Sequence, residues 1–179
     1  MGLANIFKKM LISRTFSIER GRIRMFGTTD WTLYPAKAMA KMIQRIGESE
    51  GKEILYKIGY EGGKDTAEEI SHAIGFKPGS YITQKTLIEL LEFLGYGRPQ
   101  FIKLKVEKDG HHHILVHVKD NPVIEKACEL FGHKSVVCYW FMGIYAAHGE
   151  VEFGAKNVKV VENKCICKGA PYCEWESKW

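Results

Sequence analysis

Four residues in the C-terminal part of the chain combine side-chain types that suit a metal ion: Cys138, Glu162, Cys165 and Cys173. Thiolates together with a carboxylate are typical ligands of a tetrahedral zinc ion. A glycine and a proline lie between the last two cysteines, so the chain can turn there and bring both sulfur atoms to one ion. Such an ion would connect the last strands to the helix that carries Cys138.

The cysteine pattern also allows a disulfide or buried, unreactive thiols. Cys165, Cys167 and Cys173 fall within nine residues, which favours metal ligation. Whether Cys167 replaces one of the proposed ligands stays open, and Cys128 is interpreted as a thiol in the core. Five cysteines are an odd number, which argues against the fully paired framework of a small secreted domain.

Length and composition predict a single globular domain over residues 1–179. Hydrophobic residues make up 45% and aromatic residues 12% of the chain, enough for a packed core. The net charge is +5, but lysine and arginine are spread along the sequence without a long run. This distribution argues against nucleic-acid binding, which needs a clustered basic patch.

No segment approaches the roughly 18 consecutive apolar residues of a membrane span. The N-terminus lacks the long apolar stretch of a signal peptide. It also has Ile6 where a myristoylation motif requires serine or threonine. These features predict a cytoplasmic protein, in which thiols stay reduced.

Apolar residues at helical spacing predict an amphipathic N-terminal arm over about residues 1–14, which packs on its own domain or serves as a dimer arm. Two short strands, or one bulged strand, are expected over residues 16–26. Pro35 begins a helix, a second helix spans residues 51–74, and a third ends at a glycine pair near residue 95. The second helix is expected to bury five side chains: Ile54, Leu55, Ile58, Ile70 and Ile74.

A hairpin is expected over residues 100–119, with a three-residue loop that ends at a left-handed Gly110. This loop pairs residue 106 with 112 and residue 104 with 114, and it places the β-branched side chains, Ile102 included, on one face. His111, His112 and His113 are interpreted as residues of the exposed polar face.

Asn121 and Pro122 mark the start of a helix, and Ser135 can cap the next one. That later helix carries Cys138 and is apolar almost all round, which predicts deep burial. His148 is expected to end this helix, as a ligand or as a C-terminal cap, and the cap is the favoured interpretation. Strands over 158–161 and 173–175 complete a predicted α+β fold, an antiparallel sheet packed with several helices.

Residues 137–175 resemble the vinyl-4-reductase domain family. The match consists of a helical cysteine with aromatic and glycine neighbours, then Glu-x-x-Cys, then Gly-x-x-x-Cys-x-aromatic: Cys138, Trp140, Gly143, Glu162, Cys165, Gly169, Cys173 and Trp175. Cys167 departs from the family pattern. The resemblance implies a fold shared with transport-particle subunits, haem nitric-oxide sensor domains and phenol-sensing domains.

The resemblance further implies a homodimer that binds a small hydrophobic or aromatic molecule, with structural zinc held by Cys138, Glu162, Cys165 and Cys173. Candidate pocket residues come from the most apolar predicted elements: Phe93, Tyr96, Phe101, Trp140 and Tyr145. A non-catalytic sensor module is the favoured function. A dimeric scaffold, or a reductase accessory protein of tetrapyrrole-type metabolism, is the alternative. The chain lacks Gly-x-Gly-x-x-Gly, so a bound nicotinamide is not indicated.

Overall fold

Two antiparallel sheets and five α-helices form from residues 16–19, 22–25, 29–74 and 81–179, the part of the chain that this computed structural model describes. The α+β prediction is confirmed. The helices are α2 (Ala36–Glu50), α3 (Lys52–Ile74), α4 (Tyr81–Phe93), α5 (Pro122–Phe131) and α6 (Cys138–Phe153). None of the helices in these ranges is both long enough and apolar enough to cross a bilayer.

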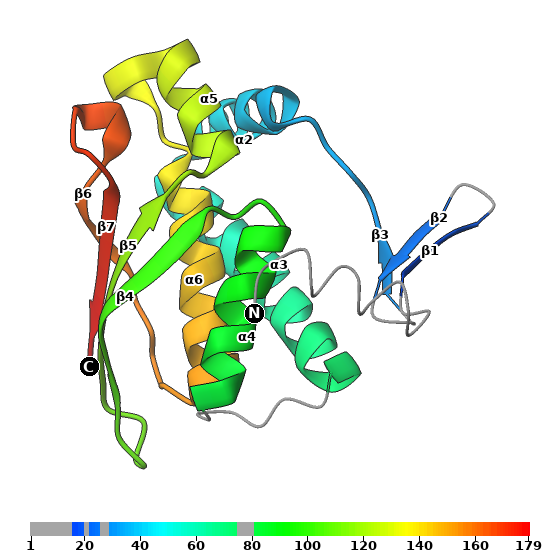
Figure 1. The fold of residues 1–179 in the computed structure, drawn as a ribbon. Helices are drawn as coiled ribbons and strands as arrows, with labels where there is room; N and C mark the ends of the chain where they lie inside the picture. The colour runs from blue at the N-terminus through cyan, green and yellow to red at the C-terminus, as the bar shows by residue number, and fades with distance from the viewer. Residues whose placement is uncertain (1–15, 20–21, 26–28, 75–80) are drawn as a thin grey trace.

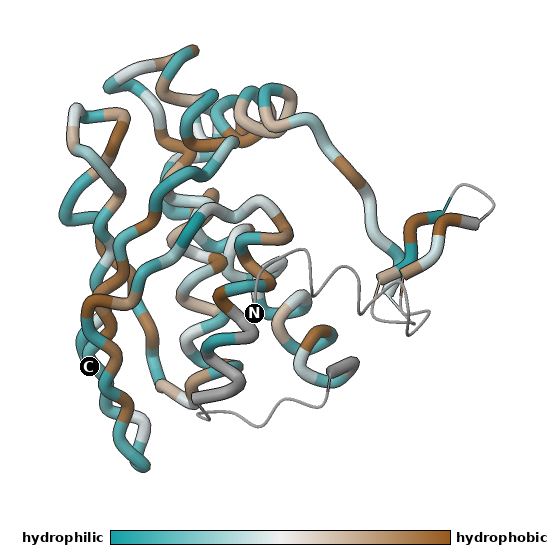
Figure 2. The backbone as a smooth tube through the Cα atoms, viewed as in Figure 1, coloured by the Kyte–Doolittle hydropathy of each residue, from teal (hydrophilic) through white to brown (hydrophobic). Residues whose placement is uncertain are grey.

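The larger sheet has the strand order β4-β5-β7-β6 and lies along one side of the molecule (Figure 1). Its strands are β4 (Arg98–Val106), β5 (His112–Lys119), β6 (Val161–Lys164) and β7 (Cys173–Lys178). Apolar side chains of β5 and β7 reach α6, where the Tyr145 and Trp175 rings meet edge to face at 5.0 Å. The brown segments in Figure 2 follow the inner strands of this sheet.

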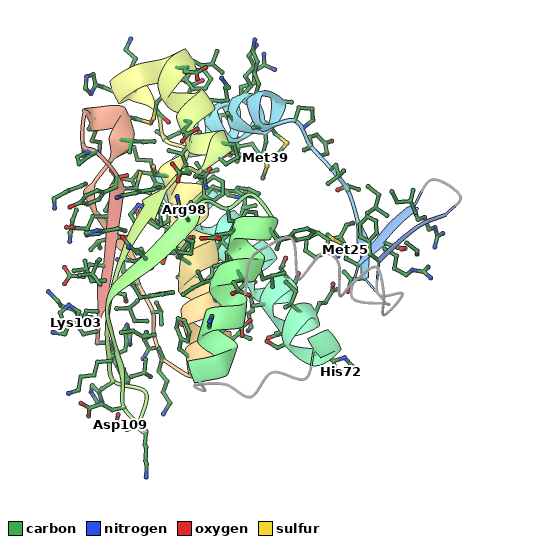
Figure 3. The ribbon with its side chains drawn as sticks, viewed as in Figure 1. Met25, Met39, His72, Arg98, Lys103 and Asp109 are labelled. Atoms are coloured by element: carbon green, nitrogen blue, oxygen red, sulfur yellow. A yellow bond between two sulfur atoms is a disulfide. The ribbon has the colours of Figure 1, made fainter. Side chains whose placement is uncertain are left out.

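The smaller sheet lies at the N-terminal end, to the side of the helices (Figure 1), and its Trp31 packs against the core. It contains β1 (Phe16–Glu19), β2 (Arg22–Met25) and β3 (Thr29–Trp31), in that order. Two short strands were expected here, and the third was not. Met25 (Figure 3) is its most buried side chain among the described residues. The predicted arm over residues 1–14 lies outside the described residues.

Helix α6 is buried on all sides, as its composition predicts. It is longer than expected, because it continues to Phe153 and ends at the left-handed Gly154. The interpretation of His148 as a C-terminal cap is therefore wrong. His148 lies inside the helix and is buried. Ser135 does not cap the helix either, although its hydroxyl accepts a bond from the Val137 N–H at 3.4 Å.

Helices α3 and α6 cross at glycines, so their backbones touch. A Cβ on Gly143 would lie 2.1 Å from the carbonyl oxygen of Tyr56, and one on Gly59 would lie 2.1 Å from that of Trp140. This contact turns the glycine face of α3 inward together with Leu55. The burial predicted for Ile54 and Ile58 is therefore wrong, since their side chains are 44% and 39% exposed.

The predicted register of the hairpin is confirmed: Val106 pairs with His112, and Leu104 pairs with Ile114. Gly110 adopts a φ of +95°, which favours glycine. A register shift after Phe101 was not foreseen. As a result Ile102 is 52% exposed, which corrects its assignment to the inner face.

The exposure predicted for one of the three adjacent histidines of the hairpin is wrong. His112 is buried, and its Nε2 lies 2.8 Å from Ser177 Oγ. The next histidines along β5 pair with carboxylates of β7. His113 Nε2 lies 2.7 Å from Glu176, and His117 Nε2 lies 2.8 Å from Glu174.

The helix crossing gives the first prediction. Gly143→Ala should lower the free energy of unfolding by roughly 2 kcal/mol, because the added methyl group meets backbone atoms that cannot turn away. Gly62→Ala, in α3, is the matched control, because among the described residues no atom outside the neighbouring turns of α3 lies within 4 Å of the new Cβ. It should raise stability by up to about 1 kcal/mol through helix propensity. Urea denaturation measures both, and equal shifts in the two variants would contradict the close crossing.

Candidate metal centre and interior cavity

Three buried cysteines from distant parts of the chain meet at one point. Cys138 Sγ lies 3.6 Å from Cys165 Sγ and 3.9 Å from Cys173 Sγ. All three sulfur atoms lie within 4.8 Å of one another, a grouping that could hold a metal ion. The fold therefore brings together the three thiols of the predicted ligand set.

Local turns position these thiols. Cys138 is the first residue of α6, and Cys173 is the first residue of β7. Between the two strands, a 3₁₀ turn over Ile166–Lys168 reverses the chain, and the Ala170 N–H bonds back to the carbonyl oxygen of Cys165 at 3.2 Å. Gly169 supports the reversal with a φ of +89°. The glycine between the cysteines thus has the turn-forming role expected from the sequence.

The thiols influence each other's ionisation. Hydrogen bonds from Cys138 and Cys173 lower the pKa of the Cys165 thiol to about 2. The same hydrogen bond with Cys165 raises the pKa of Cys138 well above its ordinary value. The cluster therefore favours a thiolate at Cys165, and thiolate is the form that binds metals.

Glu162 lies beside this cluster rather than within it. Its side chain is 7% exposed, and its Oε2 accepts a hydrogen bond from the Lys168 ammonium group. Its Oε1 is buried and has no hydrogen-bond partner among the described residues. Burial raises the pKa of this carboxyl group, and the nearby Cys165 adds to the effect, while Lys168 lowers it. A buried oxygen with unused lone pairs beside three thiols fits a metal ligand set.

The other two cysteines form a disulfide, Cys128–Cys167. It joins α5 to the 3₁₀ turn that follows Cys165. The interpretation of Cys128 as a core thiol is therefore wrong. Cys167 is bonded to Cys128, and the free thiols of the chain are Cys138, Cys165 and Cys173.

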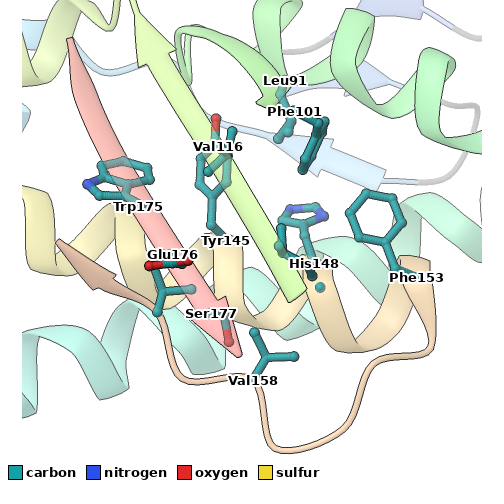
Figure 4. A pocket seen from close by; sticks show the side chains of 13 residues that line it. Leu91, Phe101, Val116, Tyr145, His148, Phe153, Val158, Trp175, Glu176 and Ser177 are labelled. Atoms are coloured by element: carbon teal, nitrogen blue, oxygen red, sulfur yellow. The ribbon is translucent and has the colours of Figure 1, made fainter. Parts of the chain in front are cut away.

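A second feature is an interior cavity between α6 and the large sheet (Figure 4). Its volume is about 20 Å³, which is room for roughly one water molecule. Its walls are mostly apolar and include Leu91, Ile114, Val116, Phe153, Val158 and Trp175. Four residues with polar side chains also line it: Tyr145, His148, Glu176 and Ser177.

Glu176 and Ser177 bond to His113 and His112, whereas Tyr145 and His148 have unpartnered polar atoms. The Tyr145 hydroxyl and both ring nitrogens of His148 are buried without a partner in the described part of the chain. Glu152 Oε1 lies 3.7 Å from His148 Nδ1, too far for a hydrogen bond, and instead accepts one from the Ser71 hydroxyl at 3.1 Å. Burial raises the pKa of Tyr145, so the hydroxyl keeps its proton. Unsatisfied buried polar groups are rare and call for an explanation.

Two of the five candidate pocket residues line this cavity, Phe101 and Tyr145. The others do not: Tyr96 packs edge to face on Phe141 with ring centres 6.0 Å apart, and Trp140 and Phe93 lie outside the lining. Sequence reasoning missed His148. It follows Tyr145 by three positions on one helix, which is the spacing that places two side chains on the same face.

No protein-family model and no curated protein matches this sequence. The fold does match solved structures. The phenol-responsive sensory domain of the transcription activator PoxR, crystallised with phenol, superposes with a TM-score of 0.71 at 18% identity, over 99% of this chain and 88% of that domain. This chain thus has the fold of a sensory domain, as the resemblance implied.

Two further neighbours belong to the protein classes named in the resemblance. One is a vinyl-4-reductase family protein from Methanocaldococcus jannaschii, with a TM-score of 0.49, 17% identity, and coverage of 86% of this chain and 85% of that one. The other is trafficking protein particle complex subunit 3 from Naegleria fowleri, covalently bound to palmitic acid. It has a TM-score of 0.48, 14% identity, and coverage of 80% and 93%.

The cluster gives the second prediction. Cys165→Ser should lose bound metal, because it removes the favoured thiolate, whereas Cys167→Ser should keep it, because that sulfur is bonded elsewhere. Elemental analysis of protein purified without added metal measures both. The reverse result would assign the ligand role to Cys167, and a metal content below one tenth of an equivalent in folded wild-type protein would contradict the site.

Proposed function

We propose that this protein is a non-catalytic binding module for a small hydrophobic or aromatic molecule, and that a structural zinc ion supports the binding site. The unpartnered Tyr145 hydroxyl and His148 ring in an apolar cavity carry this proposal. Specific small-molecule sites combine apolar walls with a few convergent polar groups in this way.

The ligand class follows from the apolar walls and from the two unpartnered polar groups, those of Tyr145 and His148. Aromatic and aliphatic side chains surround the cavity, so the body of the ligand is apolar. Tyr145 has a proton to donate, and the His148 ring can donate or accept, so the ligand carries at least one hydroxyl or similar group. The fold neighbour was crystallised with phenol, a molecule of this class. At about 20 Å³ the cavity must widen to admit an aromatic ring.

Zinc is the proposed metal because three thiolates and one carboxylate make a tetrahedral set. Cys138, Cys165, Cys173 and Glu162 would hold it. The unpartnered Glu162 Oε1 is available to the ion, and Lys168 can remain on Oε2. When bound, the metal supplies a cross-link between α6 and the last strands. A site filled by four protein ligands has no open position, which supports a structural role.

Homodimerisation is a further part of the proposal. The cytoplasmic location expected from the sequence is not, because a disulfide such as Cys128–Cys167 is rare where thiols stay reduced. The small sheet lies to the side of the helices (Figure 1), and an apolar stripe precedes it in the sequence. Both features suit an arm that reaches a second copy. Sedimentation at micromolar concentration should give about twice the chain mass of 20.4 kDa, and the mass of a single chain would contradict the dimer.

The third prediction tests the ligand site. Tyr145→Phe should weaken phenol binding about two- to tenfold, because one hydrogen bond is lost. Without ligand the same change should leave stability unchanged or raise it, because it removes a buried hydroxyl that has no partner. Titration calorimetry and thermal melts measure the two effects.

Toluene is the matched control ligand, because it has the ring of phenol without the hydroxyl. Its affinity should not change in Tyr145→Phe. Equal weakening of both ligands, or no saturable binding of either to the zinc-loaded protein, would contradict the proposed site. A reaction that turns over and requires the zinc would favour an enzyme instead.

A further inference from the structure

A second depression lies where the first turns of α3 and α6 meet the segment that leads into β6. Its volume is about 640 Å³, within the range of roughly 300–1,000 Å³ that small-molecule sites occupy. Val160 is the one residue that lines both this groove and the interior cavity in the described part of the chain. The groove is therefore a separate place for a ligand.

The groove has apolar surface along its length. Met142 of α6 lies beneath it, and the rings of Tyr56 and Tyr139 contribute to its walls. Val161 is 49% exposed although it belongs to a strand of the large sheet. An apolar molecule that lies in the groove would remove this surface from water, at about 25 cal/mol per Å².

The charges along the groove are unbalanced. Three lysines and two glutamates line it, which leaves one excess positive charge. Lys168 is already paired with Glu162. Lys52 lies over the Tyr139 ring at 5.2 Å, and neither Lys52 nor Lys159 forms an ion pair with a carboxylate among the described residues. These two ammonium groups can therefore receive an anion.

The groove also contains an uncharged hydrogen-bond donor, the hydroxyl group of Tyr56. The Tyr56 hydroxyl accepts a hydrogen bond from the Val160 N–H at 3.1 Å, so its own proton remains free for an acceptor. Burial raises the pKa of Tyr56, which keeps that proton in place. The groove thus offers apolar contact and hydrogen-bond donors together.

We propose that this groove binds a small amphipathic acid, a molecule with an apolar body and one anionic group that lies between Lys52 and Lys159. The site is separate from the interior cavity, and it borders the proposed metal site, because Glu162 and Lys168 line the groove. Octanoate is a suitable probe, and 1-octanol is its neutral counterpart with the same chain length.

Titration calorimetry and amide chemical shifts of the full chain test the proposal. Octanoate should bind more tightly than 1-octanol, with shifts centred on Tyr56, Tyr139 and Val161. The double variant Lys52→Gln/Lys159→Gln should weaken octanoate about two- to twentyfold and leave 1-octanol unchanged, as expected for the loss of two exposed charge interactions. Lys126→Gln, an exposed lysine paired with Glu129 outside the groove, is the control and should change neither.

A second variant removes the space rather than the charge. Val161→Trp places a large side chain at an exposed strand position that tolerates aromatic residues, and it should abolish octanoate binding in a folded protein. Equal affinity for octanoate and 1-octanol would overturn the proposal. So would shifts confined to Tyr145 and His148, or the absence of saturable binding at millimolar octanoate.

Discussion

The cluster of Cys138, Cys165 and Cys173 is the contact on which the other features depend, because it joins the start of α6 to both strands of the last hairpin at their turn. A thiol is a weak hydrogen-bond partner, so three of them hold the helix loosely without a metal. Ionised thiolates without a metal would repel one another. A bound cation reverses both effects, and its binding free energy becomes folding free energy, because the unfolded chain has no preformed site.

Helix α6 transmits this constraint to the rest of the molecule. Its first residue belongs to the cluster, its glycine face contacts α3, and Tyr145 and His148 lie further along it in the interior cavity. A small shift at the start of the helix would move both polar groups relative to the sheet. The proposed metal site and the proposed ligand site thus lie on one helix, so a metal at one would influence the other.

Local pattern predicted much of this structure. Alternation of apolar residues in the hairpin fixed its register around Leu104, and Asn121 caps α5 through two backbone N–H groups. The predictions that the structure contradicts failed for physical reasons. The bulge that exposes Ile102 depends on sheet pairing, and a helix apolar all round has no periodicity to show that His148 lies inside it. The Cys128 disulfide joins residues 39 positions apart, a pairing that spacing alone cannot reveal.

The measurement that tests the central claim most directly is a thermal melt and a phenol titration of the same sample, before and after a strong chelator removes its zinc. The account predicts that the melting temperature falls by at least about 5 °C, or roughly 2 kcal/mol in a chain of this size, and that phenol affinity falls with it. Re-addition of zinc should restore both. Complete removal of the metal with melting and binding unchanged would contradict the claim that it holds α6 in place.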